Sequence, residues 1–309
     1  MLGAASSPTT VRSSVAMELE SKTSEERGRL VIVATPIGNL GDLSPRAARA
    51  LAEADLVAAE DTRRTRVLLD SLGVSVPMTS VHDHNEDRRA GPLLDRVAAG
   101  QRVVVVTDAG TPGLADPGFV LVREARARGL AVEAVPGPAA ALQALVLSGL
   151  PMDRFAFEGF LPRKAGPRSR RLTELATDPR TLVFYVAPHR AAEDLAAMAR
   201  AFGDRPAGLA RELTKLHEEV WTGGLVKLAE RAAEGVRGEV TVVVSGAPAP
   251  TAPEAADLAV RVTELVAAGM DKKEATAAVA KAAGVPRRAV YQALLDADGS
   301  LGGRTIRPP

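Results

Sequence analysis

The sequence predicts an α/β protein with two α/β domains, followed by a small helical domain. Between residues 29 and 247, short β-branched apolar runs alternate with Ala-, Leu- and Arg-rich segments of helical period, and residues 257–296 have helical periodicity throughout. Apolar strands that alternate with helices are typical of a mainly parallel sheet with helices on both faces. A chain of 309 residues is also long for a single domain.

The expected strands are six short runs rich in Val, Ile and Ala. They are LVIVAT (30–35), ADLVAA (54–59), RVVVVT (102–107), LAVEAV (130–135), TLVFYVA (181–187) and EVTVVVSG (239–246). Helices are expected between them, for example in SPRAARALAEA (44–54) and GFVLVREARARG (118–129). Ser44 followed by Pro45 is a typical helix start, because a serine hydroxyl caps the first turn and proline fits its first position.

Breaks in composition divide the chain into six expected segments. Residues 148–170 are rich in Pro, Gly and Arg and indicate a domain boundary near residue 150, and GAPAPTAPEAA (246–256) has the composition of a linker. The N-terminal stretch is small, polar and aperiodic, as in disordered leaders, and Met17 is an alternative start. The segments are a leader (1–28), an N-terminal α/β domain (29–149), a C-terminal α/β domain (150–247), a linker (248–256), a helical domain (257–296) and a tail (297–309).

The composition excludes several classes of function. The chain has no cysteine, so disulfides, thiolate nucleophiles and Cys-ligated zinc are excluded, and a reducing, cytoplasmic location is expected. The 39 basic residues nearly balance the 38 acidic ones, so a polyanion would have to meet a local basic patch. Aromatic residues make up only 3% of the chain, which does not favour nucleic-acid binding on a stacking platform.

Three Gly- and Pro-rich loops follow predicted strands. They are ATPIGNLGD (34–42), TDAGTPGLADPG (107–118) and VPGPAA (135–140). In open α/β sheets, ligands bind at the carboxyl ends of the strands, so the three loops together predict one binding cleft.

The longest of these loops, residues 107–118, indicates the kind of ligand. The chain contains neither G-x-G-x-x-G nor G-x-x-x-x-G-K-[ST], so a dinucleotide or triphosphate cradle is not expected. Asp108 and Asp116, with backbone kept accessible by Gly110 and Gly113, suit a ligand that carries a positive charge and amide-type hydrogen-bonding groups. The alternative is that the glycines form tight turns and the aspartates cap them.

Three ionisable clusters could serve proton transfer, and each has a structural alternative. They are Glu60–Asp61–Thr62–Arg63, His82–Asp83–His84–Asn85–Glu86 and Arg211–Glu212–Leu213–Thr214–Lys215. Asp61 or Thr62 could instead cap a helix, and Glu212 and Lys215 could form a surface ion pair. The two histidines have no evident third ligand, so no metal site is expected.

The C-terminal segment, residues 257–296, predicts a three-helix unit. Gly269 ends one helix and Asp271 starts the next, and Gly284–Val285–Pro286 makes a turn before the third. The last two helices resemble a helix-turn-helix. Arg287 and Arg288 could then begin a helix that contacts RNA. The alternative is a unit that packs on the catalytic domains or on a partner subunit, and it is slightly favoured because the segment has only a small excess of positive charge.

Several strings together resemble the tetrapyrrole methylase superfamily, and within it the branch that methylates ribosomal RNA. They are ATPIGNLGDLSPRA, AEDTRRTRVLL (59–69), HDHNE (82–86), TDAGTPGLADPG, VPGPAA, APHR (187–190) and RELTKLHEE (211–219), in the family's order over about residues 29–296. The resemblance implies two α/β domains of the tetrapyrrole-methylase type with S-adenosylmethionine (SAM) in the cleft between them. It also implies a homodimer that methylates the ribose 2′-hydroxyl of a cytidine in 16S ribosomal RNA of the small ribosomal subunit.

The resemblance also implies a set of cofactor-binding residues. Its members are Pro36 and Ile37 in the first loop, Asp108, Gly110, Thr111, Pro112 and Leu114 in the second, Ala139 and Ala140 after the third, and Tyr185, Ala210 and Glu239 in the second domain. The last three match by strand position rather than by motif. One departure is visible: the family usually has an acidic residue and Ser before PHR, and this chain has Val186–Ala187.

Transfer of a methyl group to a ribose hydroxyl needs alignment, a proton acceptor or a nearby cation, and contacts to RNA phosphates. The candidate catalytic residues are Asp61, His84, Glu212 and Lys215. A mobile basic loop, PRKAGPRSRR (162–171), would bind RNA through Arg163, Lys164, Arg168, Arg170 and Arg171, unless it is only a solvated linker. The remaining alternatives are a methyltransferase acting on a precorrin-like macrocycle or on diphthine, and a non-catalytic RNA-binding module.

Overall fold

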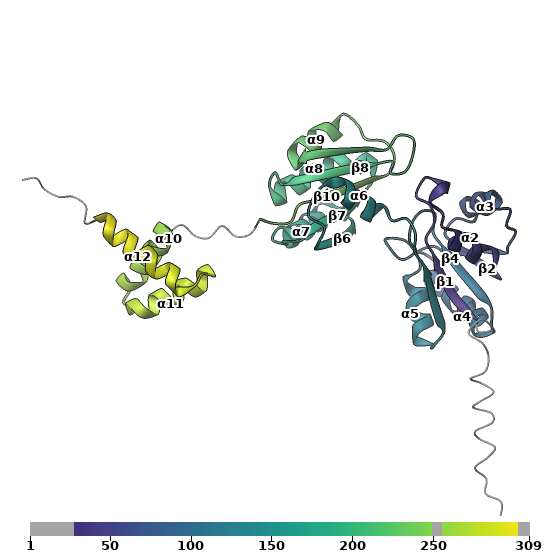
Figure 1. Ribbon diagram of the computed structural model, residues 1–309, viewed down its shortest axis with the longest axis horizontal. Helices are drawn as coiled ribbons and strands as arrows, with labels where there is room; N and C mark the ends of the chain where they lie inside the picture. Colours follow the sequence, from purple (N-terminus) through teal and green to yellow (C-terminus); the bar gives the residue numbers. More distant parts are fainter. Residues whose placement is uncertain (1–27, 249–254, 302–309) are drawn as a thin grey trace, which may run out of the picture. The chain divides into compact units, whose positions relative to one another are not determined.

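The computed structural model describes residues 28–248 and 255–301. These residues form two compact units, one ending at Ala247 and the other beginning at Pro248 (Figure 1). The expected leader lies outside the described residues except for Gly28, as do most of the expected linker and residues 302–309 of the tail. None of the helices in the described ranges has both the length and the apolar character needed to cross a bilayer.

The first sheet is parallel, as predicted. Its five strands lie in the order β3-β2-β4-β1-β5 and all of their pairings are parallel. The strands are β1 (Arg29–Val33), β2 (Leu56–Ala59), β3 (Met78–Ser80), β4 (Arg102–Val106) and β5 (Ala131–Val135).

Helices cover both faces of this sheet. Alternate side chains of a strand point to opposite faces, so Val31 and Val33 of β1 pack with α2 (Pro45–Ala52) and α3 (Thr62–Ser71). Leu30 and Ile32 pack on the other face with α4 (Glu86–Ala98) and α5 (Phe119–Ala127). The predicted capping of the helix at 44–54 is confirmed, because the Ser44 hydroxyl accepts a hydrogen bond from the Ala47 N–H.

The strand order places the first two loops at a switch point. β1 and β4 are neighbours, but the chain leaves β1 toward β2 on one side and leaves β4 toward β5 on the other. Two loops that diverge in this way leave a crevice at the carboxyl ends of the strands. The short helix η1 (Leu40–Asp42) ends the loop after β1.

The second sheet is mixed, so the prediction of a mainly parallel sheet is wrong here. Its order is β6-β7-β10-β8-β9, and only β6 and β7 pair in parallel. Its strands are β6 (Phe155–Phe160), β7 (Thr181–Val186), β8 (Pro206–Arg211), β9 (Glu219–Gly224) and β10 (Val240–Val244). The apolar run of β10 is buried throughout although its pairings are antiparallel, because helices cover both faces of this sheet as well.

Four helices cover the second sheet. α6 (Ala140–Ser148) packs on one face through Ala141, Ala144 and Leu145. The other face carries α7 (Ala165–Leu175), α8 (Ala191–Phe202) and α9 (Leu225–Ala233), with η2 (Pro188–Arg190) ahead of α8. α6 therefore precedes residue 150 in the chain but packs against the second sheet (Figure 1).

Some elements were not predicted. β3, β6, β8 and β9 are short or contain Gly, Pro or charged residues, so their sequences lack the continuous apolar pattern of the other strands. The prediction of a mobile basic loop at 162–171 is wrong from residue 165 onward, because the chain forms α7 there. Pro167 lies in the first turn of α7, where a missing N–H costs little.

The C-terminal unit is a three-helix unit, as predicted. It consists of α10 (Ala255–Ala267), α11 (Lys272–Ala283) and α12 (Arg287–Leu301) around its own apolar core. Asp271 caps α11 by accepting hydrogen bonds from the Lys273 and Glu274 N–H groups, and Gly284 ends it in the left-handed conformation. Both boundaries confirm the sequence prediction.

Candidate active site

The three Gly- and Pro-rich loops meet at the carboxyl ends of β1, β4 and β5. Thr35 and Gly110 exchange backbone hydrogen bonds of 2.9 and 3.1 Å, which join the first loop to the second. The Thr111 hydroxyl donates to the Pro138 carbonyl at 3.4 Å and joins the second loop to the third. Gly110 has φ +85°, a conformation that costs other residues energy.

A cavity of about 440 Å³ opens beside this junction and is lined from both sheets of the first unit. This size suits a small-molecule ligand. The lining residues are Ile37, Glu60, Arg64, Asp108, Ala109, Gly110, Thr111, Leu114, Asp116, Ala140, Phe160, Tyr185, Val186, Ala187, Pro188, Glu239, Val240 and Thr241.

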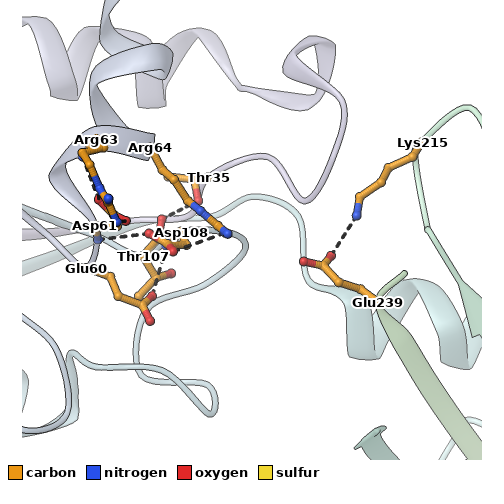
Figure 2. A network of polar contacts seen from close by, with 9 residues as sticks. All are labelled: Thr35, Glu60, Asp61, Arg63, Arg64, Thr107, Asp108, Lys215 and Glu239. Atoms are coloured by element: carbon orange, nitrogen blue, oxygen red, sulfur yellow. Dashed lines mark hydrogen bonds and ion pairs between the residues drawn. The ribbon is translucent and has the colours of Figure 1, made fainter. Parts of the chain in front are cut away.

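The cavity lining is acidic. It carries four carboxylates, those of Glu60, Asp108, Asp116 and Glu239, against the single guanidinium of Arg64. Asp108 is held in place because its carboxylate accepts from the Asp61 N–H at 3.0 Å and pairs with Arg64 at 3.3 Å, while its own N–H donates to Glu60 at 3.2 Å (Figure 2). Such a lining attracts a cation.

Asp116 carries the most perturbed carboxyl group of the cavity. Burial, together with the negative charges of Glu60, Asp83, Asp108 and Glu239, raises its pKa to about 7. Burial likewise raises the pKa of Glu60. Ala115, the residue before Asp116, has φ +65°, which is uncommon for a residue with a side chain. Strained backbone of this kind is often found at functional sites.

Lys215 links the loop after β8 to the start of β10. Its ammonium donates to Glu239 at 3.1 Å (Figure 2). It also donates to Glu212 at 2.9 Å. Its aliphatic chain lies against Gly38 of the first loop, where an added Cβ would meet the Lys215 Cγ at 2.4 Å. Lys215 therefore orients the cavity carboxylate of Glu239 and closes the first loop against the second sheet.

Two residues of the HDHNE segment have structural roles. The buried carboxylate of Glu86 accepts from the Gly118 N–H at 2.9 Å and from the Leu121 N–H at 3.1 Å. This carboxylate anchors the end of the second loop at the start of α5, which has no side-chain cap of its own. Asn85 accepts from the His82 N–H at 3.0 Å and is also buried.

Most of the predicted cofactor residues line the cavity. Those that do are Ile37, Asp108, Gly110, Thr111, Leu114, Ala140, Tyr185 and Glu239. Pro36 and Pro112 lie in the same loops without lining the cavity, and Ala139 is the buried N-cap of α6. Ala210 is buried in β8, where it pairs with Thr241.

None of the four predicted catalytic residues lines the cavity. Asp61 caps α3, and its hydrogen bonds from Arg63 hold its pKa at about 2. His84 is exposed beside His82, with ring centroids 6.0 Å apart. Glu212 and Lys215 form the ion pair that the sequence left as an alternative, and through Glu239 they reach the edge of the cavity.

The five predicted RNA-binding residues divide into two groups. Arg168 is buried and bound to Asp194 at 3.0 Å and to Glu193, and Arg171 pairs with Glu158 at 2.5 Å and Glu174 at 3.0 Å. Arg163, Lys164 and Arg170 are exposed, and their side chains make no ion pair or hydrogen bond to any residue in the described ranges.

The cavity lining also contains residues that were not in the list of cofactor-binding residues implied by the resemblance, one of which, Asp116, was predicted to suit a positively charged ligand. They are Glu60, Arg64, Ala109, Asp116, Phe160, Val186, Ala187, Pro188, Val240 and Thr241. Glu60 and Arg64 belong to the string AEDTRRTRVLL (59–69), and Asp116 lies in the second loop. Their charged side chains in these motifs could therefore have identified them as site residues. Phe160 ends a strand that the sequence pattern did not predict, so no such signal existed for it.

Known proteins are similar to this chain in sequence and in fold. The family model for "Tetrapyrrole (Corrin/Porphyrin) Methylases" matches residues 29–229. Two relatives are named ribosomal RNA small subunit methyltransferase I. The one from Mycobacterium tuberculosis is 49% identical over 280 residues, which cover 89% of this chain and 98% of that protein. The one from Pseudomonas aeruginosa is 46% identical over 277 residues, which cover 88% of this chain and 98% of that protein. The solved uroporphyrin-III C-methyltransferase of Thermus thermophilus, complexed with S-adenyl homocysteine, has the same fold: TM-score 0.52, 24% identity, 71% of this chain and 97% of that one.

The residues of the cavity fit SAM. This cofactor carries a sulfonium and an ammonium cation, and the cavity offers four carboxylates, accessible backbone at Gly110 and an apolar wall that includes Ile37 and Tyr185. When bound, SAM supplies an activated methyl group. By its family match, by its identity to these relatives and by this site, the chain belongs to the tetrapyrrole methylase family and is a SAM-dependent methyltransferase.

Proposed function

We propose that this protein methylates the ribose 2′-hydroxyl of a cytidine in 16S ribosomal RNA within the small ribosomal subunit. The observation that carries the proposal is the 46–49% identity to proteins named ribosomal RNA small subunit methyltransferase I, along 98% of their length. The cytidine and its 2′-hydroxyl rest on the resemblance of the motifs to the RNA branch of the family. Such a substrate implies a cytoplasmic enzyme.

The cavity residues would hold the cofactor and exclude water. Asp108, Gly110 and Thr111 offer a carboxylate and backbone groups at the junction of the loops, and Tyr185, Glu239 and Thr241 form the wall on the second sheet. Pro36, Pro112, Ala139 and Ala210 would act by shaping the backbone behind these groups. Methyl transfer from a sulfonium is an in-line displacement, so the main contribution of the protein is to align the acceptor oxygen.

The proton of the acceptor hydroxyl needs a base or a nearby charge. Asp116 is the carboxyl group that combines a place in the cavity lining with a pKa of about 7, the range that suits a general base. We therefore add Asp116 to the four candidate catalytic residues that were chosen from the sequence. Glu212 and Lys215 would act through their contacts to Glu239, which lines the cavity. Asp61 and His84 do not line the cavity and would act only if their side chains moved into it.

Three exposed cations are available for RNA phosphates, two just before α7 and one within it. Arg163, Lys164 and Arg170 are free to pair with phosphates, whereas Arg168 would first have to leave a buried ion pair. Neutralising one of the three should weaken RNA binding. It should also reduce the slope of log affinity against log salt concentration by about one, the effect of losing one phosphate contact. Arg171 shares its charge with two glutamates and should contribute less.

We also propose a homodimer, as the resemblance implies. α6 supports it, because its outer side exposes Leu142, Val146 and Leu147 while its inner side packs on the second sheet. Exposed apolar patches of this kind often mark contacts between proteins. Light scattering should give twice the monomer mass for the wild type and the monomer mass for Val146→Asp; a monomeric wild type would contradict the proposal.

The decisive experiment combines this protein, SAM and small ribosomal subunits that lack the modification. RNA mass spectrometry should locate one new methyl group on the 2′-oxygen of a cytidine in 16S ribosomal RNA. A Gly110→Val variant serves as the control, because a branched side chain is strained at φ +85° and should weaken SAM binding. A methyl group on a base atom, or methylation of a precorrin-like macrocycle but not of the subunits, would refute the assignment.

A further inference from the structure

A second hollow adjoins the cofactor cavity. It has a volume of about 620 Å³, and its lining includes Phe160, Arg163, Ala187, Arg190, Glu193 and Asp194. Phe160 and Ala187 line both spaces, so the two adjoin at these residues. Because Ala187 contributes only a methyl group, the aromatic ring of Phe160 is the principal side chain at their border.

Phe160 is unusually placed for a phenylalanine. It ends β6 with 59% of its surface exposed, in a chain that contains few aromatic residues. Its ring packs against Tyr185, with centroids 5.6 Å apart, and Tyr185 in turn packs against Phe157 at 4.9 Å. The ring is therefore supported by other aromatic side chains while much of it stays accessible, as in proteins that stack a nucleobase.

The charges of the second hollow are also arranged for such a ligand. Asp194 is neutralised by Arg168 and Arg190, at 3.0 and 2.9 Å, and Glu193 is bound by Arg168. Arg163 is exposed and pairs with no described residue, so its guanidinium remains available for an anion. An accessible aromatic ring beside an unpaired arginine combines the two contacts that proteins make with unstacked nucleotides.

We propose that this hollow is the subsite for the acceptor nucleotide, with its base stacked on Phe160 and an adjacent phosphate paired with Arg163. The inference deepens the proposed function and rests on it. A base held at the border of the two spaces would put its ribose next to the cofactor cavity. The nucleotide would have to be unstacked from its neighbours to enter, at a cost that the contact with Phe160 offsets.

The test compares Phe160→Ala and Phe160→Tyr with Phe119→Ala. Phe119 is a matched control, because it is 63% exposed on α5 and lines neither space. Phe160→Ala should lower kcat/KM for undermethylated subunits by on the order of 10-fold or more, mainly through KM, while the Kd for SAM stays within about twofold. Phe160→Tyr keeps the ring and should restore most of the loss, and Phe119→Ala should behave as wild type.

A binding measurement without turnover makes the result independent of catalysis. A short single-stranded oligoribonucleotide with a fluorescent base analogue at the acceptor position should be quenched by the wild type and less by Phe160→Ala. An unchanged kcat/KM in Phe160→Ala, an equal loss in Phe119→Ala, or a weakened Kd for SAM would each overturn the subsite while the wild type still methylates RNA. A wild type that does not methylate the subunits overturns the proposed function and the subsite together.

Discussion

At the scale of single residues, the carboxyl group of Asp116 leads to the most specific prediction, which concerns the pH dependence of the reaction. Its pKa of about 7 means that near neutral pH it can both hold and release a proton. If it accepts the proton of the acceptor hydroxyl, the single-turnover rate should rise with pH as Asp116 ionises and then reach a plateau. The positive charge of bound SAM favours the ionised form, so the apparent pKa of this rate at saturating SAM should lie below 7.

Replacing Asp116 should remove this dependence. Asp116→Asn should lower the single-turnover rate by roughly 10²-fold or more and leave little pH dependence between pH 5 and 8. Calorimetry should show a Kd for SAM that changes much less than the rate. A variant that keeps the wild-type rate would exclude Asp116 as the base and leave Asp61, His84, Glu212 and Lys215 as the candidates.

The same carboxyl group should make the stability of the cofactor-free protein depend on pH. Its pKa is raised from an ordinary value of 3.8, so the folded protein binds the proton more tightly than the unfolded chain does. Its contribution to stability is therefore present below about pH 4 and is lost as the pH rises to 7. Urea unfolding should show Asp116→Asn to be more stable than wild type at pH 8, with a difference that shrinks toward pH 5. Equal stability at both pH values would contradict the raised pKa.

At the scale of elements, the second loop is anchored by Glu86. Its buried carboxylate satisfies two N–H groups at the start of α5, and Glu86→Ala would leave both without a partner. The free energy of unfolding should fall by about 1–3 kcal/mol, and the Kd for SAM should rise because the loop that carries Asp116 loses its support. Glu86→Gln keeps an acceptor and should lose less. Asp87→Ala, at the exposed neighbouring position, is the control for a general effect on α4.

α7 offers a second test at this scale, because it carries both buried and exposed arginines. Arg168→Ala would leave Asp194 buried beside a single remaining cation, Arg190, and should lower the free energy of unfolding by roughly 3–5 kcal/mol. Arg170→Ala, two residues along the same helix, should leave stability unchanged and weaken RNA binding instead. Chemical denaturation and RNA titration on the two variants separate these outcomes. Loss of RNA binding without loss of stability in Arg168→Ala would restore its role as a phosphate contact.

At the scale of the whole molecule, the two units have separate apolar cores. All residues that line the proposed cofactor cavity precede residue 248, and the C-terminal helices pack around their own cluster. A chain that ends at Ala247 should therefore fold and bind SAM with a Kd within about twofold of the full chain. Its affinity for small ribosomal subunits then measures what the three-helix unit contributes to RNA binding. A truncated chain that loses SAM affinity would show that the C-terminal unit supports the site.

The sequence by itself determined much of this protein. Gly- and Pro-rich loops after apolar strands predicted one binding cleft, because the ends of parallel strands meet at one edge of a sheet whatever packs around them. The Ser44 and Asp271 caps and the Gly284 helix end were also predictable, since each depends on a few neighbouring residues. The motif strings were specific enough to indicate the family.

Only the tertiary structure decided what each charged side chain does. Asp61 and Asp116 both follow strands of the first sheet, but one caps a helix with a pKa of about 2 and the other sits in the cavity with a pKa of about 7. Arg168 and Arg170 lie two residues apart, yet one is buried in an ion pair and the other is exposed. Burial and charge partners come from segments distant in the chain, such as α8 for Arg168, and so does the support that Tyr185 gives to the ring of Phe160. No local sequence pattern indicates these partners, because the residues of the candidate active site come together only where the two sheets meet.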